Sequence, residues 1–181
     1  MATTHGITSN TYQRVLMGPG AVYIGTAGTQ VLGATRGGNV LEINRTFMDI
    51  RPDGSKGKVK GFRYLESAEY KLTVRLMEVT EQNLTYALAG SSLASHVISL
   101  GEISDTTYID KITIAAEVKG VTATEASAVK CELTNCLVEG PVIINFPENG
   151  STEVELTFYA HFDSTALTTE PCSLTFTPVS A

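Results

Sequence analysis

The chain has 181 residues, 43% hydrophobic and 18% charged, with a net charge of −6 and a pI near 5.0. This composition suits one globular domain with a substantial core, and its acidity argues against a dedicated nucleic-acid-binding protein. No apolar run reaches the roughly 18 residues of a membrane helix, and no basic segment followed by an apolar stretch marks a secretory signal, so we expect cytoplasmic synthesis and no membrane association.

The N-terminal region is predicted to contain an arm followed by a first pair of strands. Residues 1–17 are mostly polar and show no clean period, so we expect a flexible arm that only a partner orders. Residues 18–181 are expected to form a single β domain. Ala21–Gly25 is predicted to be a short strand between glycine-rich turns, and Asn39–Phe47 alternates as a second strand.

A long polar segment, about residues 49–66, follows this second strand. It carries five basic and three acidic residues with three interleaved glycines, and is too polar to contribute to a core. A connection of this length in a compact domain is usually functional or disordered. We therefore expect a long projecting loop, and a function that concerns a surface this loop touches.

The middle of the chain predicts a strand and then the only convincing helix. Glu69–Met77 alternates with period 2. Its core-facing residues are Tyr70, Leu72, Val74 and Leu76. A short helix is expected over about residues 80–90, with Thr80 as N-cap and Gly90 as the left-handed cap. Its apolar stripe is expected to consist of Leu84, Ala87 and Leu88. Because so short a helix is marginal alone, it must pack on a sheet.

The C-terminal half predicts further strands. They are expected at Lys111–Val118, Lys130–Val138, Val142–Phe146, Ser151–Phe162 and Ser173–Thr177. The second of these loses its period at Asn135–Cys136, which suggests a bulge. Along residues 151–162, alternation places Glu153 and Glu155 outward. The predicted class is mainly β: a two-sheet β-sandwich or partly closed barrel with one flanking short α-helix.

Signatures of catalysis, cofactor binding and metal binding are missing from the sequence. A phosphate loop fails at Gly54–Lys58, because Pro52 stands at the first glycine position and Val59 at the hydroxyl position. The histidines lack metal spacing, and the three cysteines are interpreted as buried thiols. These residues are His5, His96, His161, Cys131, Cys136 and Cys172.

The charge is unevenly distributed along the chain. The first hundred residues carry ten basic and seven acidic side chains, and the remainder carries three and twelve. Such a split can mark complementary surfaces on one molecule, or simply supply the net charge that solubility requires. Both interpretations stay open at this stage.

The order of elements suggests a family. A polar arm leads into GPGAVYIGT (Gly18–Thr26), LGATRGGNVLEINRTF (Leu32–Phe47), the loop RPDGSKGKVKGFRYLES (Arg51–Ser67), a strand, and a helix at TEQNLTYALAG (Thr80–Gly90). This order resembles that of the major tail tube proteins of long-tailed (siphovirus-type) bacteriophages, most clearly over residues 18–90. Beyond that range, the resemblance rests on strand pattern and length.

The resemblance implies a structural protein without enzymatic activity, metal or cofactor. Members of this family join sheets edge to edge into rings, usually of six copies, which stack into a tube around a tape-measure protein. The tube conducts the genome. Implied partners are therefore other copies, the tape-measure, tail terminator and tail-tip proteins, and transiently passing DNA. The implied location is the tail of the virion, after assembly in the host cytoplasm.

The family resemblance also implies a role for the residues of the long loop, and charge suggests one for two glutamates. The long loop projects onto the adjacent ring in such proteins. The inter-ring candidates are therefore Arg51, Asp53, Lys56, Lys58, Lys60, Phe62, Arg63 and Tyr64. Because an acidic lumen would repel DNA, Glu153 and Glu155 are candidate lumen-lining residues.

Two alternative functions come from other classes. A carbohydrate- or host-binding β-sandwich module would need an exposed aromatic platform or a calcium-type acidic cluster. A hydrolase would use Glu153 and Glu155, which lie about 7 Å apart by strand rise, near glycosidase spacing. The chain has no tryptophan to stack a sugar, and alternating carboxylates are common on a solvated strand face.

Overall fold

The computed structural model describes residues 16–25, 30–118, 129–146, 148 and 150–176. Most of the N-terminal segment expected to be flexible, residues 1–17, lies outside these residues, since the first described strand begins at Leu16. Within the described part of the chain, no helix is long and apolar enough to cross a membrane.

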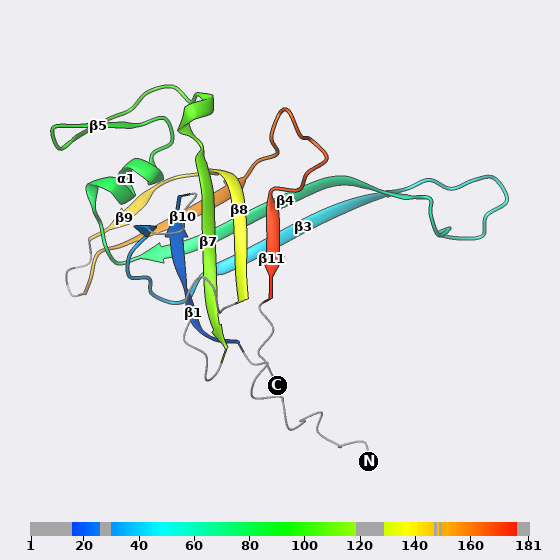
Figure 1. The fold of residues 1–181 in the computed structure, drawn as a ribbon, viewed down its shortest axis with the longest axis horizontal. Helices are drawn as coiled ribbons and strands as arrows, with labels where there is room; N and C mark the ends of the chain where they lie inside the picture. Colours follow the sequence, from blue (N-terminus) through cyan, green and yellow to red (C-terminus); the bar gives the residue numbers. More distant parts are fainter. Residues whose placement is uncertain (1–15, 26–29, 119–128, 147, 149, 177–181) are drawn as a thin grey trace, which may run out of the picture.

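Over the described residues the fold is mainly β, with one antiparallel sheet of nine strands and a separate two-stranded hairpin (Figure 1). The sheet strands are β1 (Leu16–Ile24), β2 (Gln30–Val31), β3 (Val40–Asp49), β4 (Arg63–Leu76), β7 (Ile109–Val118), β8 (Val129–Val138), β9 (Ile143–Asn145), β10 (Glu153–Ala160) and β11 (Cys172–Thr175). Their order is β2-β1-β7-β8-β10-β4-β3, with β11 beside β8 and β9 beside β10. The sheet does not close into a barrel.

The sheet bends where β8 meets β10, which gives the fold its sandwich-like character. These two strands pair through only three residues of β8, Cys136 to Val138, and all three are buried. Beyond this corner β1, β7 and β8 cross β4 and β10 (Figure 1). The preceding residue, Asn135, has a left-handed φ of 51°. The period breaks here because this end of β8 is enclosed on both faces.

The core lies between the two crossing parts of the sheet. Tyr70, Leu72, Val74 and Leu76 of β4 are at most 2% exposed, as their alternation predicts. Val154, Leu156 and Phe158 of β10 are equally enclosed. Each fully buried large apolar side chain contributes about 1.5–3 kcal/mol. The two strands with the clearest alternation are thus central to the fold.

The helix α1 (Glu81–Ala87) is shorter than the sequence predicts, and buries a different face. Thr80 is the N-cap, as expected, and its hydroxyl accepts a hydrogen bond from the Asn83 amide at 3.1 Å. The predicted Leu84–Leu88 stripe is wrong in part, because the buried helix residues are Asn83 and Ala87. The polar Asn83 side chain faces inward because it bonds to backbone carbonyls of neighbouring segments.

The cysteines behave as the sequence predicts at two positions of three. Cys131 and Cys136 are buried, and burial raises the pKa of Cys136 to about 12. Cys172, on β11, is half-buried, and its sulfur lies 3.8 Å from that of Cys131. The hydrogen bond between these two sulfurs lowers the pKa of Cys172.

Candidate functional site

The most prominent surface feature is a hairpin arm built by β3 and β4, which continues far beyond the rest of the sheet (Figure 1). β10 pairs with β4 only as far as Tyr70. Beyond that residue, β3 and β4 pair with each other, from Asn44↔Glu69 to Asp49↔Arg63, and with no other described strand. We call residues 44–69 the arm.

The expected projecting loop over residues 49–66 is confirmed over most of its length, and only its two ends are part of the strand ladder. The irregular connection covers only residues 50–62, because β3 runs to Asp49 and β4 begins at Arg63. The register shifts between Thr46 and Phe47, and the bulge flips the faces of the outer residues. The sequence suggests a loop through the whole segment because polar residues also occupy the strand ends beside the irregular connection.

The tip of the arm consists of tight turns. The Ser55 amide donates to the Pro52 carbonyl at 3.2 Å, and the Phe62 amide donates to that of Val59 at 3.2 Å. In each turn the third residue is a glycine with positive φ, 82° at Gly54 and 88° at Gly61. These angles are typical of type II turns. Two of the three loop glycines therefore serve turn geometry.

Ion pairs stabilise one face of the arm. The Asp49 carboxylate lies 3.2 Å from the Lys58 ammonium and 3.3 Å from the Arg63 guanidinium. The same guanidinium stacks over the ring of Phe47, 4.5 Å from its centroid. Two of the predicted inter-ring cations, Lys58 and Arg63, are therefore engaged within the arm itself.

The other face of the arm is apolar. Met48 pairs with Tyr64 in the register, and the Ile50 amide donates to the Phe62 carbonyl at 2.8 Å. All four side chains are exposed, Met48 by 49%, Ile50 by 46%, Phe62 by 42% and Tyr64 by 52%. We call Met48, Ile50, Phe62 and Tyr64 the apolar face of the arm.

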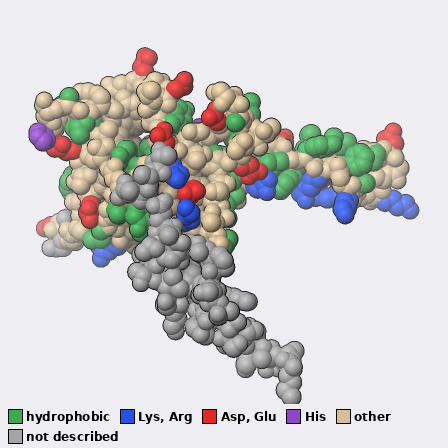
Figure 2. Space-filling model, in the orientation of Figure 1, with side chains coloured by type: hydrophobic (Ala, Val, Ile, Leu, Met, Phe, Trp, Pro, Cys, Tyr) green, Lys and Arg blue, Asp and Glu red, His purple; other side chains and the backbone are tan. Residues whose placement is uncertain are grey.

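The remaining predicted contact residues stand in solvent near the tip. Among the described residues, Arg51, Lys56 and Lys60 have no ion-pair partner, and Asp53 is exposed as well. Figure 2 shows Lys and Arg side chains along one side of the arm and hydrophobic side chains along the other. The arm thus has one basic side and one apolar side, a combination suited to contact with another protein.

The two candidate lumen residues lie on the outer face of β10, where arginines offset their charge. Arg36 is 2.9 Å from Glu153, and Arg75 is 2.6 Å from Glu155. The Glu155 carboxylate raises the pKa of Arg75 through this hydrogen bond. This part of the sheet is therefore close to neutral, although the sequence shows two adjacent outward glutamates.

An open groove that the sequence does not reveal lies between the 3₁₀ turn η2 (Asp105–Thr107) and the segment after β10. Its volume is about 370 Å³. Its lining consists of Asp105, Tyr108, Asn135, His161, Phe162, Asp163 and Ser164. Tyr108 meets the His161 ring edge-on at 5.1 Å, and His161 Nε2 is 2.9 Å from Glu139. The described residues hold no group of three His, Cys, Asp or Glu side chains placed for a metal ion.

Comparisons by sequence find no match, either to a family model or to a curated protein. Comparison of structures finds similar folds. A chain of an extracellular contractile injection system, the PVC sheath–tube complex in its extended state, matches with a TM-score of 0.55 and 10% identity, over 95% of this chain and 100% of that one.

Two further matches come from a cap and a tail. A chain of the anti-feeding prophage cap, which terminates the tube, has a TM-score of 0.52 and 13% identity over 98% of this chain and 95% of that one. A chain of the C6-symmetric tail of an empty gene transfer agent (GTA) particle has a TM-score of 0.50 and 11% identity over 88% and 96%. The protein therefore has the fold found in chains of tail, cap and sheath–tube assemblies.

Proposed function

We propose that this protein is a structural subunit of a phage-type tail tube. Copies associate side by side into rings, six to a ring, and the rings stack into a tube whose lumen conducts the genome. The arm joins each ring to the next. This role needs no catalytic group or cofactor, and it matches the nature of the assemblies whose chains share the fold.

The arm is the observation that carries this proposal. A two-stranded ribbon outside a sheet is marginally stable at best in water. This ribbon nevertheless exposes four large apolar side chains on one face, each by more than 40%. Exposed apolar surface of this kind marks interaction sites. The arm therefore has the character of a contact element that is covered in an assembly.

Side-by-side association would use the edge of the sheet. β3 is the last strand in the order, and no described strand pairs with its outer side. A long free edge is a liability in a monomer, and a closed ring of copies pairs every such edge. The β3 edge is thus our candidate for the contact within a ring.

The outer face of β10, with Glu153 and Glu155, is our candidate lumen wall. Arg36 and Arg75 form ion pairs with these glutamates, so this face has little net charge. DNA would therefore pass along it without strong attraction. The further proposed partners are the tape-measure, tail terminator and tail-tip proteins of a long-tailed, siphovirus-type virion, with assembly in the host cytoplasm.

Electron microscopy of an arm-shortened variant tests the proposal. In this variant an Asn-Gly turn, which favours tight hairpins, replaces residues 48–64. We expect concentrated wild-type protein to form tubes of uniform diameter, and the variant to form rings at most. A wild-type protein that sediments as a monomer at high concentration would refute the proposed function, and normal tubes from the variant would refute the role of the arm.

The groove beside η2 supports a second candidate, a carbohydrate- or host-binding module. Its volume of about 370 Å³ falls in the range of ligand pockets. Tyr108 and Phe162 supply aromatic surface, and Asp105 and Asp163 supply acceptors for sugar hydroxyls. A glycan array tests this function: a hit that Tyr108→Ala abolishes would establish it, and an empty array would exclude it.

A further inference from the structure

We infer that the arm of one copy docks on a specific surface of a second copy, the lobe formed by residues 77–103. This lobe contains α1 and the hairpin of β5 (Ser92–Ala94) and β6 (Val97–Ser99). The inference rests on the proposed function and adds the acceptor of the arm, which neither the sequence nor the comparisons supply.

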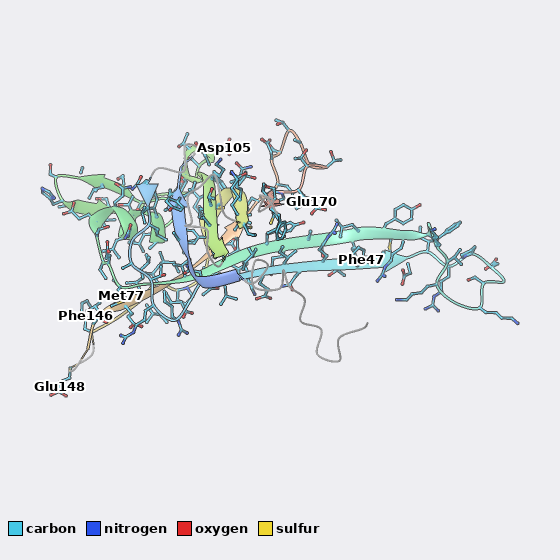
Figure 3. The ribbon with its side chains drawn as sticks, turned by 60° about the horizontal axis from the view of Figure 1, so that its bottom comes forward. Phe47, Met77, Asp105, Phe146, Glu148 and Glu170 are labelled. Carbon is cyan, nitrogen blue, oxygen red and sulfur yellow. The ribbon has the colours of Figure 1, made fainter. Side chains whose placement is uncertain are left out.

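The lobe and the arm occupy opposite ends of the long axis of the molecule (Figure 1). Met77 and Phe146 mark the lobe end in Figure 3, while Phe47 lies along the arm. One molecule therefore cannot satisfy its own arm with its own lobe. Two different surfaces at opposite ends associate head to tail, and such heterologous contacts propagate along an axis.

The charges of the two ends are complementary. The outer part of the arm, residues 50–63, carries five Lys and Arg residues and one Asp. Between Arg75 and Lys111, by contrast, the sequence contains no Lys or Arg but five acidic residues. Three of the five are in the lobe, namely Glu78, Glu81 and Glu102. This end of the molecule is therefore acidic where the arm is basic.

The lobe also exposes apolar surface that matches the apolar face of the arm. Val97 is 61% exposed, Leu100 73% and Ile103 56%, and all three belong to or follow the β5–β6 hairpin. This hairpin forms a separate sheet from the nine-stranded one, so the main core does not account for these side chains. Apolar side chains rimmed by charges are typical of protein contact surfaces.

The lobe is built to keep its shape. Gly90 follows α1 with a φ of 77°, and a Cβ at this position would lie 2.8 Å from the Gly101 carbonyl oxygen. This close approach joins the end of the helix to the segment after β6. Asn83 fixes the helix from the other side through hydrogen bonds to the Leu32 and Glu78 carbonyls, at 2.8 and 3.0 Å. A preformed acceptor loses little entropy on docking.

Two other surfaces are weaker acceptors. The outer face of β10 offers little net charge, because arginines offset Glu153 and Glu155. The groove beside η2 is acidic, but its His161 already contacts Glu139 and Asp163 already accepts from Thr165. In the lobe, Glu81 likewise contacts His96, at 2.8 Å. The lobe alone among the three surfaces, however, combines acidic side chains and no Lys or Arg with large exposed aliphatic side chains.

Cross-linking in solution tests the inference directly. Equal amounts of ¹⁴N- and ¹⁵N-labelled wild-type protein are mixed and treated with a carbodiimide, which joins amines to carboxylates without a spacer. We expect mixed-isotope peptides that connect Lys56 or Lys60 to Glu81 or Glu102. Mixed peptides that connect these lysines to the groove or to Glu155, or no mixed peptide at all, would overturn the inference.

Charge exchange supplies an independent readout with a matched control. Lys56→Glu/Lys60→Glu is expected to lower the fraction of sedimenting assemblies about tenfold, the effect of about 1.4 kcal/mol. Adding Glu81→Lys/Glu102→Lys is expected to restore it. The control adds Glu139→Lys/Asp163→Lys at the groove, which changes the net charge equally. If the control pair restores sedimentation, or if neither pair does, the inference is contradicted. Thermal melts check that each variant folds.

These results separate the inference from the proposed function. Tubes whose arm cross-links lie outside the lobe would retain the tube function and eliminate the lobe as acceptor. Arm–lobe cross-links in head-to-tail oligomers that never form tubes would retain the acceptor and eliminate the tube function.

Discussion

The double substitution Phe62→Ser/Tyr64→Ser is expected to abolish stacking while leaving the domain folded. Both side chains lie on the apolar face of the arm, outside the core, and are 42% and 52% exposed. Unfolding free energy should therefore change little, since surface substitutions usually stay within about 0.5 kcal/mol. The effect should fall on association.

The magnitude follows from the exposed area. Taking about 200 Å² for each large side chain, exposed fractions near one half leave about 400 Å² on the four residues of this face. At about 25 cal/mol per Å², its burial contributes at most about 10 kcal/mol per arm, and the double variant loses about half. Each exposed ion pair adds only about 0–1 kcal/mol. The apolar face should therefore dominate the stacking energy.

The assay is sedimentation of assembled protein at low and high salt, with melting curves as the folding control. We expect wild-type assemblies to persist at about 1 M salt, where the Debye length falls to about 3 Å, and the double variant to remain unstacked at every salt concentration. The control is Leu167→Ser, an exposed apolar position outside the arm, the lobe and both edge strands of the sheet. Assemblies that dissolve in salt, or that form normally from the double variant, would refute this account.

Three further predictions concern the domain itself. Asn83→Ala removes a buried hydrogen bond to the Leu32 carbonyl and a part-buried one to the Glu78 carbonyl. It should lower the free energy of unfolding by about 2–4 kcal/mol, measured by urea titration. Iodoacetamide at pH 8 should label Cys172 first, because the Cys131 thiol lowers its pKa, while burial raises that of Cys136 to about 12; equal labelling in the folded protein would contradict this. Burial and the hydrogen bond to Glu170 raise the pKa of Tyr70 to about 12. The protonated Tyr70 should therefore stabilise the fold below about pH 10, the pKa of tyrosine in the unfolded chain, and this stabilisation should be lost as the pH rises toward 12. Tyr70→Phe should flatten the dependence of unfolding free energy on pH in this range, and an unchanged slope would contradict the prediction.

The sequence predicts the core well where one strand carries the whole pattern. In β4 and β10 each inward residue is two positions from the next, so period 2 shows the buried face directly. It does not show the outer ends of β3 and β4 in the arm, because these ends carry charged residues and a bulge shifts the register of the pair there. It also fails for the helix face, since Asn83 is buried by hydrogen bonds to distant carbonyls that no local pattern contains.

The basic charge of the candidate site could be predicted from the sequence, but its apolar surface could not. The basic residues at the tip of the arm lie close together in the sequence, between residues 51 and 63, and are easily recognised. The apolar face brings Met48 and Ile50, at the end of β3, beside Phe62 and Tyr64, at the start of β4. Only the pairing of the two strands shows that these four residues form one surface. The offset of Glu155 by Arg75 likewise depends on a pairing between residues 80 positions apart.

Cryo-electron microscopy of the concentrated wild-type protein tests the central claim most directly. The account predicts a hollow tube of stacked rings in which each arm crosses to the adjacent ring, with its apolar face covered. Single copies at high concentration, or a tube in which the arm remains in solvent, would contradict it.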